Sequence, residues 1–402
     1  MDSKSPGIIL TTFTVVLVAC YSTEQKQFDD LPGPCVIRRT KLPRLEPVKV
    51  GYVRQIELTK DEKPFTVKTL SVRPPIFEIP DFLSETETTR LLEYAESGRL
   101  ENSDVFHNSM DTLLSQNSFE YWDLNRDDVI NIDEVIAGMR YIRDLHFTTN
   151  DVKKMLKSLN VGKRKPGMIH RSEFQPADVM KYVKEVGGLD PKVKGRHSNQ
   201  TFIDFPVNDR VAVTLDMKKA ALTGLPIEVI RGSETPVAVR YGPDGHYHCH
   251  YDSHSVNTKD SCCDRRSLDN CRVCRYITIL YFLNDVDEGG HTAFPIADDA
   301  TFKQQSWTRK SNYISNLSAY CSKANLRVKP KRGTAIMWYN HVIDKSTGWL
   351  SDLDLMSYHG GCDVMKGHKW IVNNWINVIG KNWDDLRTWN DKHSPIKRGQ
   401  GP

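Results

Sequence analysis

Gly245-His-Tyr-His-Cys-His250-Tyr-Asp252 is the stretch that decides the fold, because it places a histidine and an aspartate two residues apart. On a β-strand, side chains at this spacing point to the same face. His359 follows further along the chain. Two histidines and one carboxylate are the facial ligand set that holds a non-heme Fe(II) and leaves other coordination positions open. We therefore predict that His250, Asp252 and His359 bind iron.

Lys369 lies shortly after the second histidine and can supply a fixed positive charge for a carboxylate co-substrate. This combination is typical of Fe(II)/2-oxoglutarate oxygenases. The tripeptide alone would be weak evidence, because a short motif match carries a real risk of being accidental. The chain has 13 histidines, and among them His250 alone has an acidic residue two positions later. The alternative interpretation is a polar pair on an exposed strand.

The bulk properties narrow the class of protein. The chain has 402 residues, enough for two or three domains with ordinary hydrophobic cores. Its net charge of +4 is small for this length, so we expect no nucleic-acid partner.

The N-terminus carries an apolar run from Ile8 to Cys20. This run matches the hydrophobic region of a secretory signal and is shorter than the roughly 17–25 residues of a membrane span. We expect residues 1–22 to be a signal peptide or a signal-anchor, the latter giving membrane attachment, and residues 23–75 to be an N-terminal luminal segment. Two glycosylation sequons, at Asn199 and Asn316, agree with a glycoprotein of the secretory pathway.

Nine cysteines fit an oxidising compartment, where disulfide bonds persist. Four of them crowd into Cys262-Cys263 and Cys271-x-x-Cys274. We expect disulfides there, with Cys321 as a partner from elsewhere in the chain. A zinc site is the alternative, because Cys-x-x-Cys is a zinc-ligand spacing.

Residues 101–182 have a helical pattern and contain a match to the twelve-residue calcium loop of EF-hands at 123–134. Position 6 of this loop is Asp128, where a glycine is usual, and the left-handed backbone there costs aspartate some energy. A solvated acidic turn is the alternative. The expected calcium ligands are Asp123, Asn125, Asp127, the backbone carbonyl of Val129, Asn131 and Glu134.

A sister loop lies at residues 162–173, with Gly167, Ile169 and Glu173 in register. Arg164 and Pro166 stand where ligands belong, and positive charge repels a cation. We expect this loop to be a metal-free partner of the first.

Short strands separated by Gly- and Pro-rich turns follow from about residue 200, which favours a sandwich or jelly roll. Residues 76–98 predict a strand, a turn and a helix, and Ser84 with Glu87 offers a capping box at the helix start. The expected later strands are 211–215, 237–241, 276–282, 326–328, 334–338 and 369–375.

Four blocks carry a resemblance to the prolyl 4-hydroxylase family over about residues 76–380. They are Tyr241-Gly-x-x-Gly-x-Tyr247-x-x-His250-x-Asp252, the segment from Tyr281 to Pro295 containing Gly289-Gly-His-Thr292, Val328-Lys-Pro-x-x-Gly333, and His359-Gly-Gly-Cys362-x-Val-x-x-Gly-x-Lys369-Trp370. The helical insertion resembles an endoplasmic-reticulum branch of the family, in which EF-hands interrupt the catalytic domain.

The resemblance implies an α+β chain with a double-stranded β-helix (jelly-roll) catalytic domain and an inserted all-α EF-hand domain. The catalytic domain would be formed by residues 76–100 and 185–382, the EF-hand pair by 101–184, and a C-terminal tail by 383–402. Lys369 would pair with the distal carboxylate of 2-oxoglutarate, helped by the hydroxyls of Thr292 and Tyr247. One departure is His291, which stands where the family usually has a glutamate.

The implied activity is hydroxylation of prolines in a protein or peptide with Fe(II), 2-oxoglutarate, O₂ and ascorbate, in the lumen of the endoplasmic reticulum. The substrate suggested is a hypoxia-inducible factor α subunit or an unknown luminal protein, and calcium binding by the EF-hand accompanies the activity. A collagen-type prolyl hydroxylase and a catalytically dead calcium-binding scaffold are the alternatives. A homodimer is left open.

Overall fold

The computed structural model describes residues 41–58, 64–103, 118–175, 182, 191–255, 273–380 and 382–387. The expected signal segment, Cys262, Cys263, Cys271 and most of the C-terminal tail lie outside these residues. In the described part of the chain, no helix is long and apolar enough to cross a membrane.

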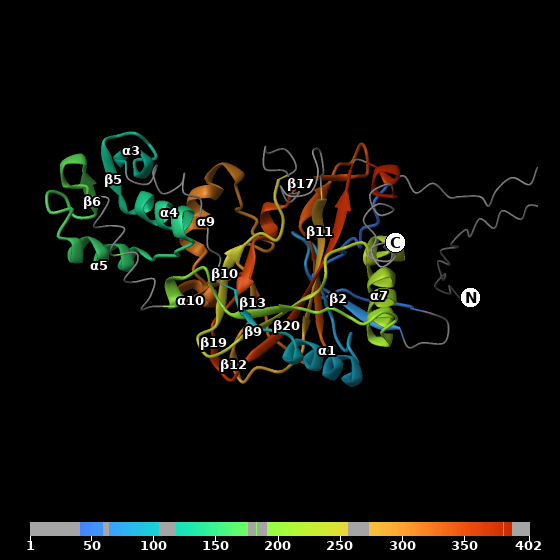
Figure 1. The fold of residues 1–402 in the computed structure, drawn as a ribbon. Helices are drawn as coiled ribbons and strands as arrows, with labels where there is room; N and C mark the ends of the chain where they lie inside the picture. The colour runs from blue at the N-terminus through green and yellow to red at the C-terminus, as the bar shows by residue number, and fades with distance from the viewer. Residues whose placement is uncertain are drawn as a thin grey trace, which may run out of the picture. The chain divides into compact units, whose positions relative to one another are not determined.

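A large antiparallel sheet forms the framework of the catalytic part (Figure 1). Its long central strands are β11 (Val273–Phe282) and β20 (Lys369–Ile379), which pair along most of their length. Across the sheet, the described strands follow the order β1 (Val53–Ile56), β2 (Phe65–Ser71), β3 (Ile76–Ile79), β15 (Ala335–Tyr339), β11, β20, β9 (Val237–Tyr241), β8 (Asn199–Phe202) and β4 (Glu101–Asn102).

A smaller antiparallel sheet faces the large one. Its order is β14 (Leu326–Val328), β13 (Thr292–Phe294), β18 (His359–Gly361), β10 (His246–His250) and β7 (Arg196–His197). One buried apolar cluster joins Phe282 and Trp338 of the large sheet to Phe294 and Val328 of the small sheet. Two sheets packed on a shared core form the expected jelly roll. Two short ribbons pair β12 (Glu288–Gly289) with β19 (Val364–Lys366) and β16 (His341–Ile343) with β17 (Leu350–Leu353).

Helices cover the outer face of the large sheet, where a second apolar cluster lies. They are α1 (Glu85–Ser97), α7 (Arg210–Thr223) and α8 (Ile227–Arg231). Figure 1 shows α1 and α7 beside this sheet, away from β10 and β13. The expected capping box of α1 is present, with Ser84 and Glu87 bonding each other's backbone amides, and such a cap stabilises a helix by about 1 kcal/mol.

The strand expected at residues 211–215 is wrong, because these residues begin α7. Valines alternate there in a strand-like way, but the side chain of Asp209 accepts a hydrogen bond from the backbone amide of Ala212 and so caps a helix. Gly224 ends the helix in the left-handed conformation. The cap residues at the two ends therefore determine the helix, despite the alternating valines within it.

A helical module lies between β4 and β7 in the chain, with its own apolar core. Its two short strands pair antiparallel, with Ile130 opposite Ile169, as in a pair of EF-hand loops. The elements are α3 (Phe119–Trp122), β5 (Val129–Asn131), α4 (Ile132–Arg143), α5 (Thr149–Leu159) and β6 (Met168–His170). Two further helices lie nearby: α9 (Trp307–Ile314) contacts α4 of this module, and α10 (Leu317–Tyr320) contacts β10.

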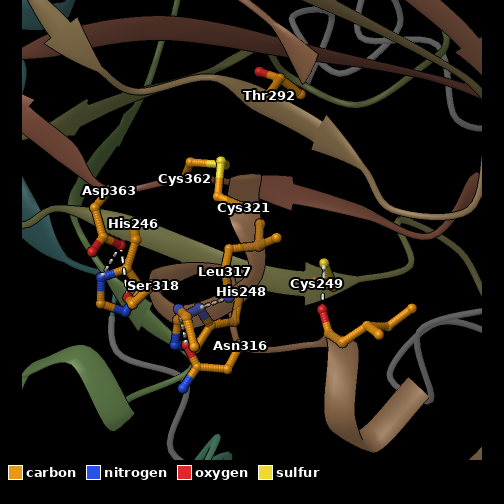
Figure 2. The surroundings of a disulfide bond; sticks show 12 residues. His246, His248, Cys249, Thr292, Asn316, Leu317, Ser318, Cys321, Cys362 and Asp363 are labelled. Carbon is orange, nitrogen blue, oxygen red and sulfur yellow. Dashed lines mark hydrogen bonds and ion pairs between the residues drawn. A yellow bond between two sulfur atoms is a disulfide. The ribbon is translucent and has the colours of Figure 1, made fainter. Parts of the chain in front are cut away.

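A disulfide joins Cys321, just after α10, to Cys362, just after β18 (Figure 2). From the sequence we expected Cys321 to pair with one of the clustered cysteines at 262–274. This expectation is wrong, because Cys321 pairs with Cys362. Cys274 is disulfide-bonded, as expected for a cysteine of this segment. Such pairings depend on strand neighbours that spacing along the chain does not reveal.

The sequon at Asn316 is inaccessible in the folded chain. The Asn316 side chain is buried, its amide nitrogen donates to the carbonyl of His146 at 2.6 Å, and its oxygen accepts from the amide of Ala319 at 3.1 Å. A glycan on that nitrogen would break both the packing and the hydrogen bond. Asn199, on β8, is exposed.

Candidate metal and co-substrate site

The antiparallel pairing of β10 with β18 creates the site, because it places His250 directly opposite His359. Opposite residues on one face of such a pair have Cβ atoms about 4.5–5.5 Å apart, and these two imidazole rings lie 4.6 Å apart. Asp252 follows the end of β10. Its carboxylate oxygens lie 3.6 Å from Nε2 of His250 and 3.5 Å from Nε2 of His359. The three predicted iron ligands thus converge on one point, with their ligand atoms within 4.8 Å of one another.

Backbone carbonyls fix both imidazole rings. Nδ1 of His250 lies 2.9 Å from the carbonyl oxygen of His248, and Nδ1 of His359 lies 2.8 Å from that of Ser357. A carbonyl oxygen can only accept, so each Nδ1 carries the proton and donates. The lone pair of each Nε2 is therefore left free and faces the carboxylate, which is the arrangement that metal-binding histidines require.

The protonation states also suit a divalent cation. Burial lowers the pKa of His359 to about 4, so this ring is neutral at physiological pH. Burial alone would raise the pKa of Asp252, but the facing His359 and His250 rings outweigh it and hold the pKa well below the usual range. Two neutral nitrogens beside a buried carboxylate leave a negative charge that a metal ion can neutralise.

Lys369 is a buried cation at the start of β20. Its Nζ lies 3.5 Å from the hydroxyl of Thr292, and within the described residues it makes no ion pair. The aromatic rings of Tyr241 and Phe282 lie 5.4 and 5.7 Å from Nζ. Burial lowers the pKa of Lys369 to about 7. An ammonium group held in this way is stabilised by an anionic ligand.

All six residues predicted for iron and co-substrate line one cavity of about 310 Å³. They are His250, Asp252, His359, Lys369, Thr292 and Tyr247. A volume at the small end of the usual range for ligand pockets fits a five-carbon dicarboxylate together with part of a peptide.

Tyr247 and Tyr241 occupy different places in this cavity. The Tyr247 ring stacks on His250 with 3.6 Å between centroids, and burial raises the pKa of its hydroxyl to about 12. Tyr241 is the tyrosine whose ring faces Lys369. Tyr241 belongs to one of the motifs in the sequence, which assigns it no role. Its place beside Lys369 follows from the pairing of β9 with β20.

Three more residues of the cavity escaped the sequence analysis. Arg275 pairs with Glu234 at 2.6 Å, and its guanidinium lies 3.7 Å from the ring centroid of Trp375. It also donates to the backbone carbonyl of Asp252 at 3.2 Å. The segments that hold Arg275, Glu234 and Trp375 are distant in the chain, so no local pattern identifies these residues.

The residues of the predicted calcium loop adopt a compact turn. The carboxylate of Asp123 accepts hydrogen bonds from the amides of Asp127 and Asp128, and that of Glu134 accepts from Leu124 and Asn131. Asp128 has a positive φ of 62°, as the sixth loop position requires. In the described part of the chain, the loop carboxylates do not converge as tightly as the ligand atoms of His250, Asp252 and His359.

The comparisons with known proteins point to one family. A family model described as the 2OG-Fe(II) oxygenase superfamily matches residues 237–377. The chain is 34% identical over 352 residues to human transmembrane prolyl 4-hydroxylase, and the aligned region covers 84% of this chain and 70% of that protein. It is 30% identical over 235 residues to prolyl 4-hydroxylase 5 of Arabidopsis thaliana, covering 58% of this chain and 66% of that protein. A 2-oxoglutarate complex of the viral collagen prolyl hydroxylase from Paramecium Bursaria Chlorella virus-1 aligns at 25% identity with a TM-score of 0.31, over 50% of this chain and 88% of that one.

Geometry and comparison agree on the class, which is the Fe(II)- and 2-oxoglutarate-dependent oxygenases. Within this class, the chain belongs to the prolyl 4-hydroxylase family.

The buried ammonium predicts how 2-oxoglutarate binding depends on pH. Only protonated Lys369 pairs well with a carboxylate, and in the free site its pKa is about 7. Above this pH, binding must take up a proton, so affinity falls by up to tenfold per pH unit. Calorimetry on the Mn(II)-loaded protein in buffers of different ionisation enthalpy measures both the affinity and the proton uptake.

Lys369→Ala should weaken 2-oxoglutarate binding about tenfold or more and flatten this pH profile, because a charge-assisted contact is lost. Lys366→Ala, which changes an exposed lysine on β19, is the matched control and should keep both. If the Lys369→Ala protein retains the parent affinity and pH profile, another residue holds the carboxylate.

Proposed function

We propose that His250, Asp252 and His359 bind Fe(II) in this prolyl 4-hydroxylase, and that Lys369 binds the distal carboxylate of 2-oxoglutarate. The observation that carries this assignment is the convergence of the three side chains on one point of a cavity that also contains the buried ammonium. The ligand nitrogens are unprotonated and the carboxylate is ionised, which is the state that a divalent metal requires.

Bound iron would supply the oxidising chemistry, in which decarboxylation of 2-oxoglutarate to succinate and CO₂ provides electrons and one atom of O₂ becomes the proline hydroxyl. The residues of the chain bind and orient the reactants. The hydroxyl of Thr292, 3.5 Å from Nζ of Lys369, binds the same distal carboxylate of 2-oxoglutarate as Lys369. The family resemblance implies that the hydroxyl of Tyr247 also binds this carboxylate. Trp375 and Leu280 line the same cavity and offer apolar surface to a proline ring.

The finer parts of the function rest on the family resemblance. Ascorbate is the reductant that restores iron left in the oxidised state. The substrate is a hypoxia-inducible factor α subunit or a luminal protein, and a collagen-type substrate is the second candidate. The human relative is a transmembrane prolyl 4-hydroxylase by name, which supports a place at the membrane of the endoplasmic reticulum. A dead scaffold would lack part of the ligand set, and all three proposed ligands are present.

The iron assignment predicts that Asp252→Ala abolishes turnover, since two protein ligands remain where three are needed. His250→Ala and His359→Ala should do the same. The assay is mass spectrometry of proline-containing peptides, together with succinate release, after incubation with Fe(II), 2-oxoglutarate and ascorbate. Near-normal hydroxylation by the Asp252→Ala protein would rule out this ligand set.

Calcium binding is the second part of the proposal. It rests on the order of oxygen-bearing residues in loop 123–134, on the pairing of Ile130 with Ile169, and on the left-handed Asp128. In the sister loop, Arg171 pairs with Glu120 and with Asp128 at 2.9 Å, so this loop contributes a cation to the first hand and not a second site. These residues belong to an inserted EF-hand domain.

One calcium ion should bind per chain, because the sister loop has Arg164 and Pro166 at ligand positions. Calorimetry should give a stoichiometry near one, lost in Glu134→Gln, which removes the charged ligand at position 12. Iron binding should persist in that variant. Two sites of similar affinity would show that the sister loop also binds metal.

Helix α4 connects this loop to the proposed iron site. Glu134 lies in the first turn of α4, and Arg140 on the same helix donates to the hydroxyl of Tyr358 at 2.6 Å. Tyr358 directly precedes His359. Its ring packs 5.0 Å from that of Tyr251, which lies between the other two ligands. A calcium-dependent shift of α4 would therefore reach the residues next to all three iron ligands.

We predict that calcium changes the Fe(II) concentration needed for half-maximal activity, and that Arg140→Leu removes this effect while keeping the calcium stoichiometry. Lys153→Ala, at an exposed position on α5, is the matched control. Thermal midpoints with calcium and with chelator provide a second readout. Identical thermal midpoints and kinetics in both conditions would show that calcium binding to the EF-hand pair does not regulate the enzyme.

A further inference from the structure

The carboxylate of Asp252 has a hydrogen-bond partner that the assigned ligand set does not include. The hydroxyl of Thr278, on β11, donates to Oδ2 of Asp252 at 2.7 Å. Both oxygens also face an imidazole: Oδ1 lies 3.6 Å from Nε2 of His250 and Oδ2 lies 3.5 Å from Nε2 of His359, each too far for a hydrogen bond. The two oxygens therefore differ in the Thr278 hydrogen bond, which holds Oδ2 and leaves Oδ1 for a metal ion.

The direction of the Thr278 hydrogen bond follows from its own partners. The side-chain amide of Asn340 donates to the Thr278 hydroxyl oxygen at 2.9 Å. The orientation of this amide is fixed, because its oxygen accepts from Nε1 of Trp338 at 3.0 Å, and an indole nitrogen can only donate. With its oxygen accepting from Asn340, the threonine hydroxyl has its single proton left for Asp252. A chain of donors thus runs from Trp338 through Asn340 and Thr278 to the carboxylate.

These groups are buried among strands that cannot shift independently. Thr278, Trp338 and Asn340 are fully buried, and Thr278 pairs directly with Trp338 between β11 and β15. On its other side, Thr278 pairs with Trp375 of β20. A β-branched side chain in the middle of a sheet has a restricted χ1 angle, so the hydroxyl is directed by the backbone itself. Valine has the same shape and would suit this apolar layer, which makes the hydroxyl the distinguishing feature of the position.

We propose that Thr278 is a positioning residue for the iron ligand Asp252. It holds Oδ2 so that the carboxylate ligates through Oδ1 alone, and coordination positions stay open for 2-oxoglutarate and O₂. A carboxylate free to turn would lose this fixed orientation and hold the metal less tightly. The inference rests on the proposed ligand set, and Trp338 and Asn340 support it by fixing the donor direction.

Metal affinity without turnover tests this role. Mn(II) binding to the metal-free protein is measured by electron paramagnetic resonance, in a Glu134→Gln background so that the calcium loop adds no second site. Removing a partner of a ligating carboxylate typically lowers metal affinity 10–100-fold, and Thr278→Val should fall in about this range. Thr278→Ser keeps the hydroxyl and should restore most of the affinity. Thr69→Val, which changes a buried threonine on β2, is the matched control and should bind like the parent.

A second pair of variants keeps the test decisive if the valine protein does not fold. Thr278→Ser and Thr278→Cys have the same shape and differ in donor strength, because a thiol is a weak donor. The cysteine variant should bind Mn(II) more weakly than the serine variant. It should also show a wider spread of Mn(II) environments in the resonance spectrum, which a loss of stability alone would not produce.

The outcomes separate this inference from the ligand assignment. If Asp252→Ala loses Mn(II) but Thr278→Val binds it as tightly as the parent, Thr278 does not position the carboxylate, and the assignment stands. Equal affinity of the serine and cysteine variants would also overturn the role of Thr278. If Asp252→Ala itself binds Mn(II) normally, the ligand set is wrong and the inference fails with it.

Discussion

The pairing of His250 with His359 across β10 and β18 is the constraint on which the site depends. Neither strand could slip by one residue without turning one imidazole to the other face of the small sheet. The shared core holds this sheet against the large one, and the disulfide at Cys362 ties the end of β18 to the segment after α10. The placement of the two imidazoles is therefore set by sheet register.

Burial of charge is the second constraint, and it explains why the cavity needs its ligands. The ionised carboxylate of Asp252 accepts a hydrogen bond from Thr278, whereas within the described residues the ammonium of Lys369 has one hydrogen-bond partner, the hydroxyl of Thr292. Buried charges without partners are costly. A divalent metal and a dicarboxylate would neutralise both charges. The unpaired charges raise the free energy of the empty site, and binding lowers it again. The same burial lowers the pKa of Lys369 toward neutrality.

Local patterns predicted much of this, and contacts between distant strands account for the rest. The strands at 237–241 and 326–328 and the capping box of α1 follow from alternation, turns and cap residues that are adjacent in sequence. The segment at 211–215 alternates like a strand, but the Asp209 cap begins a helix there. The partner of Cys321 and the contact of Thr278 with Asp252 were not predictable, since each joins segments that are distant in the chain and become neighbours only in the complete fold.

A crystal structure of the protein with Mn(II) and 2-oxoglutarate, grown without oxygen, tests the central claim most directly. The account predicts a metal bound by Nε2 of His250, Nε2 of His359 and Oδ1 of Asp252, with the distal carboxylate of 2-oxoglutarate on the ammonium of Lys369. It also predicts that Oδ2 of Asp252 keeps its hydrogen bond from Thr278. A metal held by other residues, or a co-substrate carboxylate away from Lys369, would contradict it.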